Sequence, residues 1–155
     1  MVLTACLILD DIKLSQSFID WPLHLTLMPW FQISGECLPR FLTNFGLIAT
    51  DSNPLRIEPV NKSALGPQLL SVTLIKPTTA LTNLHQKLLK SINDCGATLI
   101  QDAHVGKDFK PHITDQSGQR QLSKTAIVRN MYLVTKESNS SYRQVVHVLN
   151  LGYAN

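Results

Sequence analysis

Two stretches decide the fold: WPLHLTL at Trp21–Leu27 and FKPHITD at Phe109–Asp115. Each has an aromatic residue three positions before a histidine, a nearby proline, and a threonine two positions after the histidine. Residues two apart in an extended strand point to the same face. Each stretch would therefore present an imidazole and a hydroxyl side by side. Two such pairs, 88 positions apart (24 to 112) in one small chain, predict the two halves of a single site.

Size and composition indicate an ordinary globular protein. The chain has 155 residues, of which 44% are hydrophobic and 16% charged, so it can bury a core and is not expected to be disordered. We expect a single domain over residues 1–155. The net charge of +3 is compatible with an anionic substrate but is too small for a surface that coats nucleic acid.

The cysteines argue against a disulfide framework and against a structural zinc site. Cys6, Cys37 and Cys95 are odd in number and scattered, and the chain has no CxxC pair and no Cys/His cluster. Reduced thiols in a cytoplasmic protein fit this pattern best.

Runs of apolar residues predict the elements. Val2–Leu9 is interpreted as a buried strand and not as a signal peptide, because it lacks a basic leader and a cleavage site, and no stretch is long enough to span a bilayer. The spacing in Thr79–Cys95 is that of an amphipathic helix, which Thr78 or Thr79 can cap. The stretch from Asp10 to Pro22 is expected to be irregular. Further strands are predicted at Leu23–Ile33, Leu55–Lys62, Leu69–Ile75, Thr125–Thr135 and Tyr142–Leu151, and a further helix at Pro39–Ile48.

The order of these elements shows no regular βαβ alternation, so the predicted class is α+β. The repeated motif suggests two similar lobes that each offer one strand to a shared cleft.

Paired imidazoles and hydroxyls suit the cleavage of a phosphodiester. A base must take a proton from the nucleophile and an acid must give one to the departing alkoxide, and two histidines can hold opposite protonation states near neutral pH. Each threonine hydroxyl can donate a hydrogen bond to a non-bridging phosphate oxygen. This scheme needs no metal and no cofactor, and the sequence offers no obvious carboxylate cluster to hold a metal.

These motifs and their spacing resemble the 2H phosphoesterase superfamily, and within it the group of 2′-5′ RNA ligase-like and RNA cyclic phosphodiesterase proteins. The resemblance covers nearly the whole chain. It implies a bilobal fold with two pseudo-symmetric antiparallel-sheet lobes around a central cleft. It also implies a metal-independent hydrolase that opens 2′,3′-cyclic phosphates, or acts on 2′-5′ linkages, of RNA or nucleotides.

The resemblance implies four catalytic residues, which are His24, Thr26, His112 and Thr114. By the logic of the family, His112 would activate the attacking water and His24 would protonate the leaving ribose oxygen, although the two histidines have equivalent environments by sequence.

Three further residues are candidates for binding the substrate. Trp21 and Phe109 could flank the cleft and stack on a base, or could be core aromatics at the entrance of a strand. Lys110 could bind an additional phosphate.

The residues after the second motif depart from the family pattern, in which an apolar residue and then a basic one often follow. Here Asp115, Gln116 and Ser117 occupy this stretch, and strand alternation would turn Asp115 away from Thr114. The missing basic group could be supplied by Lys110, by Arg120 or by Arg129.

The remaining histidines of the loops and helices have simpler interpretations. His85 is expected to be a surface residue beside the apolar stripe of its helix. His104 is expected to be an exposed loop residue, with the rim of the cleft as the alternative.

The expected partner is a nucleotide or an RNA terminus with a cyclic phosphate, and the protein is expected to be monomeric. One alternative is a non-catalytic module of the same fold that binds nucleotides or RNA ends. Another is a structural or interaction domain in which the histidines are incidental.

Overall fold

The computed structural model of the protein describes residues 1–115, 121–137 and 140–152. The elements in chain order are β1 (Val2–Ile8), β2 (Ser17–Phe18), β3 (His24–Gln32), α1 (Leu38–Thr50), β4 (Leu55–Ile57), β5 (Pro59–Leu65), β6 (Leu70–Ile75), α2 (Thr79–Asp94), β7 (Thr98–Leu99), the 3₁₀ turn η1 (Gly106–Asp108), β8 (His112–Thr114), β9 (Ala126–Val128), β10 (Asn130–Lys136) and β11 (Arg143–Asn150). The fold is α+β, as predicted.

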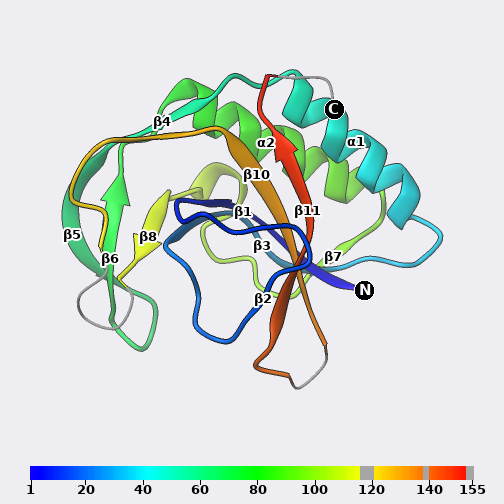
Figure 1. The fold of residues 1–155 in the computed structure, drawn as a ribbon, viewed down its shortest axis with the longest axis horizontal. Helices are drawn as coiled ribbons and strands as arrows, with labels where there is room; N and C mark the ends of the chain where they lie inside the picture. Colours follow the sequence, from blue (N-terminus) through cyan, green and yellow to red (C-terminus); the bar gives the residue numbers. More distant parts are fainter. Residues whose placement is uncertain (116–120, 138–139, 153–155) are drawn as a thin grey trace.

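Most of the strands form one antiparallel sheet with the order β2-β11-β10-β1-β3-β8-β6-β5, and β7 pairs with the end of β3. The first motif lies on β3 and the second on β8. The two strands meet through one pair of residues, Leu25 and Ile113. The sheet therefore has two halves, β2-β11-β10-β1-β3 and β8-β6-β5, and each contributes one motif strand to the junction. The helices α1 and α2 lie side by side across one face of the sheet (Figure 1).

The helices form where the sequence supplies start signals and an apolar stripe. In α1, Pro39 lies in the first turn, where its missing N–H costs nothing. In α2, the Thr78 hydroxyl accepts a hydrogen bond from the Leu81 N–H at 3.2 Å, which identifies Thr78 as the cap. Leu81, Leu84, Leu88 and Ile92 are buried along the inner face of α2.

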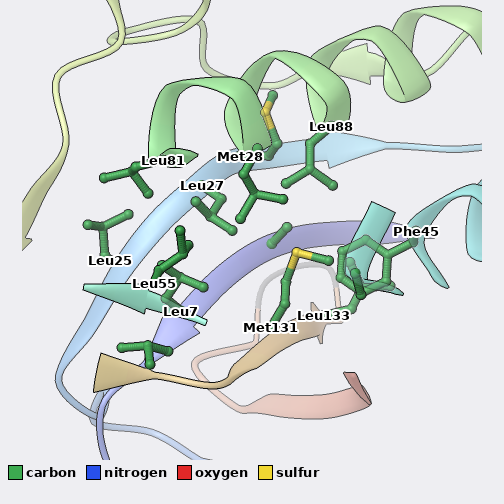
Figure 2. Close-up of a cluster of buried hydrophobic side chains, with 14 of the residues drawn as sticks. Leu7, Leu25, Leu27, Met28, Phe45, Leu55, Leu81, Leu88, Met131 and Leu133 are labelled. Atoms are coloured by element: carbon green, nitrogen blue, oxygen red, sulfur yellow. The ribbon is translucent and has the colours of Figure 1, made fainter. Parts of the chain in front are cut away.

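The main core fills the space between the helices and the sheet, where Leu25, Leu27, Leu81 and Leu88 gather from β3 and α2 (Figure 2). A second, smaller cluster includes Tyr132, with partly buried aromatic residues packed against it. The residues of this cluster alternate along the strands with those of the main core. Their side chains therefore cover the other face of the sheet. The two motif histidines share this second face.

The structure corrects two predicted strands. Leu55–Lys62 is not one strand, because the strand conformation is interrupted at Glu58. β4 pairs with β9 in a separate two-stranded sheet, while β5 pairs with β6. The predicted strand Thr125–Thr135 is likewise divided into β9 and β10 at Arg129, because each part pairs in a different sheet.

Short elements also lie where irregular chain was expected. The stretch from Asp10 to Pro22 contains β2, which pairs with β11 at the edge of the sheet. β7 and η1 precede the second motif. Among the described residues, no helix is both long and apolar enough to cross a membrane.

Candidate active site

The pairing of β3 with β8 brings the two motifs together. Leu25 faces Ile113 in antiparallel register, so His24 lies opposite Thr114 and Thr26 lies opposite His112. All four flanking side chains point to the face away from the helices, because Leu25 and Ile113 point into the main core with no exposed surface. The two histidines are diagonal neighbours, and such positions lie roughly 7–8 Å apart in a regular antiparallel pair.

The same local hydrogen bond orients both histidines. Nδ1 of His24 donates to the carbonyl oxygen of Pro22 at 2.8 Å, and Nδ1 of His112 donates to the carbonyl oxygen of Lys110 at 2.7 Å. A carbonyl can only accept, so Nδ1 must carry the hydrogen in each ring. In the neutral ring of each motif, Nε2 is then the nitrogen that can accept a proton.

The surroundings of both histidines favour the neutral imidazole. Burial lowers the pKa of His24 to about 4, and the positive charges of His112 and Arg143 act in the same direction, against the Pro22 hydrogen bond and Asp10. Burial also lowers the pKa of His112, with His104 and Lys110 as the charged neighbours that act in the same direction. Without a ligand, the neutral form of both rings therefore predominates at neutral pH.

Two adjoining hollows lie at the motifs, and we call them together the cleft. The larger, of about 370 Å³, is lined by residues that include His24, Thr26, Trp30 and Thr114. The smaller, of about 180 Å³, is lined by residues that include Thr26 and His112. Thr26 lines both hollows, together with Pro29 and Gln101, and so marks the boundary at which the two motifs meet.

Trp21 lines the larger hollow, and its indole ring is already stacked on another side chain of the protein. Its ring stacks on His24, with centroids 4.1 Å apart and planes inclined by 24°. The guanidinium of Arg143 lies 5.3 Å from the Trp21 ring centroid. Trp21 therefore fixes the His24 ring in addition to lining the cleft.

Phe109 is partly buried, and its position is compatible with both of its interpretations. Its ring stacks on His85, with centroids 3.9 Å apart and planes inclined by only 6°, although it also borders the smaller hollow. The expectation that His85 is a surface residue is wrong, since its side chain has no exposed area. His85 lies four residues after Leu81 and three before Leu88, which places it on the apolar face of α2.

His104 is half-buried and lines the smaller hollow, so the expectation of an exposed loop residue is wrong. Its ring is 5.5 Å from that of His112, in an edge-on arrangement. The backbone of His104 has φ of +60°, an uncommon conformation for a residue other than glycine. The alternative from the sequence, a place at the rim of the cleft, matches its position.

The basic residues around the cleft differ in position. Lys110 is exposed and lines the smaller hollow. Arg129 lines a separate hollow of about 300 Å³ with residues from the end of β1, and Arg120 lies outside the described residues. Arg143, which the sequence analysis did not single out, acts on His24 electrostatically.

Asp115 is directed into a hydrogen-bonded cluster away from the cleft, as strand alternation predicted. Its carboxylate accepts hydrogen bonds from Lys62 Nζ at 2.7 and 2.8 Å, from Ser71 Oγ at 2.7 Å and from Thr73 Oγ1 at 3.2 Å. These interactions lower the pKa of Asp115 although burial opposes them. The other two residues of this stretch, Gln116 and Ser117, lie outside the described residues.

Sequence reasoning missed three residues near the motifs: Trp30, Gln101 and Arg143. Trp30 had a usable signal, because it lies on the same strand as His24. Gln101 and Arg143 reach the site only through pairing and loop placement, which no local pattern reveals. Within the described part of the chain, no three His, Cys, Asp or Glu side chains lie close enough to hold a metal ion.

Comparisons with known proteins place this geometry in context. A family model described as the 2′-5′ RNA ligase superfamily matches residues 7–144. A search of curated proteins found no match. The fold is similar to that of TT0787 of Thermus thermophilus, with a TM-score of 0.65, 17% identity and coverage of 98% of both chains. It is also similar to E. coli LigT complexed with 3′-AMP, with a TM-score of 0.64, 15% identity and coverage of 97% of this chain and 98% of the other.

Proposed function

Because the chain belongs to the 2′-5′ RNA ligase superfamily, which is the 2H phosphoesterase superfamily that the motifs resembled, we propose that it is a phosphodiesterase. The proposed reaction is the metal-independent opening of 2′,3′-cyclic phosphates, or of 2′-5′ linkages, in RNA or nucleotides. His24, Thr26, His112 and Thr114 are the proposed catalytic residues. The observation that supports this most is the Leu25–Ile113 pair, because it puts both motifs on one face of the sheet.

The reaction follows from the two imidazoles. Nε2 of His112 takes a proton from a water molecule, whose oxygen forms a new bond to phosphorus. The bond between phosphorus and one ribose oxygen breaks, and Nε2–H of His24 gives that oxygen a proton. The product is a phosphate monoester with a free ribose hydroxyl. Thr26 and Thr114 donate hydrogen bonds to the non-bridging oxygens, where negative charge grows in the transition state.

The acid must gain its proton in the presence of substrate. With a pKa of about 4 in the ligand-free protein, His24 is almost entirely neutral at pH 7. An anionic phosphate beside the ring favours the imidazolium and raises this pKa. Substrate binding therefore charges the acid only when there is a leaving group to protonate.

The larger hollow suits a nucleoside, because Trp21 and Trp30 offer aromatic surface beside His24. The ammonium group of Lys110 gives the smaller hollow a positive charge suited to a phosphate. Solved structures of E. coli LigT hold 3′-AMP and, in another complex, NADP⁺, which supports a nucleotide as the ligand class of this cleft.

The test is turnover of 2′,3′-cyclic nucleotides by the purified protein in excess chelator, with the nucleoside monophosphate as product. Replacing His24 or His112 by Ala is expected to lower kcat roughly 10²–10⁴-fold. His147→Ala is the matched control, because His147 lies on β11 and lines neither hollow of the cleft. Full activity in both variants would reject the proposed roles of the two histidines.

The alternative functions predict different results when binding is measured beside turnover. Calorimetric binding of a cyclic nucleotide without turnover would indicate the non-catalytic module. Inertness toward cyclic mononucleotides, cyclic-ended RNA and 2′-5′ oligonucleotides, without binding of any of them, would reject the enzyme and the binding module together.

A further inference from the structure

The strand that carries the first motif bulges immediately after Thr26. Cys6 of β1 pairs with Thr26, and the preceding Ala5 pairs with Met28, so Leu27 is an extra residue that faces no residue of β1. Such a bulge leaves the backbone groups of the extra residue outside the regular ladder. Leu27 is only 1% exposed, so its carbonyl oxygen needs a donor from inside the protein.

His85 of α2 supplies this donor. Its Nδ1 lies 2.7 Å from the Leu27 carbonyl oxygen, and its Nε2 accepts a hydrogen bond from the Gly106 N–H at 2.9 Å. The carbonyl can only accept and the amide can only donate. Only the neutral ring with its hydrogen on Nδ1 satisfies both partners.

The second partner, Gly106, is held by hydrogen bonds at both its backbone N–H and its carbonyl oxygen. Its N–H donates to His85, and its carbonyl oxygen accepts a hydrogen bond from Nε2 of the neighbouring Gln86 at 3.1 Å. Gly106 has φ of +67°, a conformation that glycine adopts without strain. The ring of Phe109 stacks on His85. Two consecutive residues of α2 thus fix the turn that leads into the second motif.

Residues on both sides of this turn line part of the smaller hollow. His104 lies two residues before Gly106 and contacts the His112 ring, and Lys110 lies four residues after it. A displacement of Gly106 would therefore move groups that contact His112 or surround it. Through its other nitrogen, His85 holds the backbone next to Thr26.

We propose that His85 is a positioning residue that ties the first motif strand to the segment before the second motif. This inference rests on the proposed function of the cleft. His85 does not contact the substrate in this account. It fixes the distance between the halves of the site by bridging the Leu27 carbonyl and the Gly106 amide.

Protonation would break this bridge. An imidazolium carries hydrogen on both nitrogens, so Nε2 would face the Gly106 N–H with a second donor. Burial lowers the pKa of His85, against the Leu27 hydrogen bond, which keeps the ring neutral at physiological pH. Of the charged residues on the packed elements, Lys107 and Asp108 of η1 are exposed, and Lys87 of α2 pairs with Asp51 of the segment after α1.

The first test compares His85→Leu, His85→Gln and the control Lys90→Gln, which changes an exposed residue of the same helix. His85→Leu fills similar space without polar atoms and is expected to lower kcat roughly 10–100-fold, since small misplacements of catalytic groups have effects of this size. His85→Gln can donate and accept at once, so it is expected to recover most of the loss. Equal kcat in all three variants and the wild type would overturn the proposal.

The second test does not use activity, so it separates this inference from the proposed function. The ¹⁵N NMR signals of His85 at pH 7 are expected to show a neutral ring with hydrogen on Nδ1. Protection of the Gly106 amide from hydrogen exchange is expected to fall in acid in the wild type and to stay constant in His85→Gln, if that variant is folded by circular dichroism. A protonated ring, the other tautomer, or an unprotected Gly106 amide at pH 7 would overturn the bridge even if the enzyme is active. If the bridge is intact but the protein cleaves no phosphodiester, the hydrogen bonds of His85 are confirmed. The proposed function is then rejected, and the positioning role of His85 is rejected with it.

Discussion

Leu25 and Ile113 face each other across β3 and β8, and neither side chain has exposed surface. This pair joins the two halves of the sheet from the core side, while the neighbouring side chains of both strands face the cleft. The pair therefore links the packing of the core to the geometry of the cleft. A change on the buried side of the junction is expected to displace the motif side chains that we propose to be catalytic.

Leu25→Ala is expected to lower the free energy of unfolding by roughly 2–5 kcal/mol, because it removes a buried side chain and leaves a cavity. It is also expected to lower turnover at a temperature at which the variant remains folded. Ile113→Val removes one methylene and is the milder comparison, at about 0.5–1.5 kcal/mol. Chemical denaturation and kcat measure the two effects. A destabilised Leu25→Ala protein with unchanged kcat would show that the junction does not position the motifs.

The lowered pKa values of His24 and His112 predict an acidic optimum for kcat/KM. In the proposed mechanism, the active form of the free enzyme carries one proton on the pair, and both pKa values lie below the ordinary 6.5 of histidine. Above both pKa values, the singly protonated fraction falls about tenfold for each pH unit. The profile of kcat/KM against pH tests this directly. A flat profile from pH 6 to pH 8 would contradict it.

Arg143 is expected to hold the pKa of His24 down through its positive charge. Its Nη1 donates to the carbonyl oxygens of Ile19 and Ser141 at 2.6 and 2.8 Å, which anchors the guanidinium beside Trp21. Arg143→Gln is therefore expected to raise the pKa of His24, whereas Arg143→Lys keeps the charge and should change it less. NMR titration of the His24 ring measures both. An equal pKa in the wild type and Arg143→Gln would remove Arg143 from the electrostatics of the site.

Asp115→Asn tests the cluster behind the second motif. The variant loses the charge that pairs with Lys62 and weakens the hydrogen bonds from Ser71 and Thr73, so we expect a loss of roughly 1–3 kcal/mol of stability. The low pKa of Asp115 contributes stability above its ordinary pKa of about 3.9, and this contribution is lost as the pH falls through the lower folded value. The difference between the variant and the wild type should therefore shrink in strong acid. A constant difference from pH 7 to pH 2, in urea unfolding, would contradict this account.

The sequence was sufficient for the strands that carry the motifs, because a period of two and a flanking aromatic residue are local signals. It was also sufficient for α2, whose leucine stripe and threonine cap lie within one segment. The break at Glu58 and the division at Arg129 depend on which strand each segment pairs with, and the local apolar pattern does not contain that information.

The errors in the site have a similar origin. His85 lies on the apolar face of α2 by spacing, but its polarity suggested the surface. Its partner is the carbonyl of a bulge in another element, which only the assembled sheet creates. The low pKa of His24 arises in the same way, since it comes first from burial in the assembled sheet and then from charged neighbours such as Arg143 of β11.

The central claim is that one phosphate is held between His24 and His112. A crystal structure with a bound nucleoside 3′-monophosphate tests it most directly. We predict that the phosphate lies within hydrogen-bond distance of Nε2 of both histidines, with Thr26 and Thr114 on its non-bridging oxygens. A nucleotide bound outside the cleft, or a phosphate in contact with only one imidazole, would contradict the account.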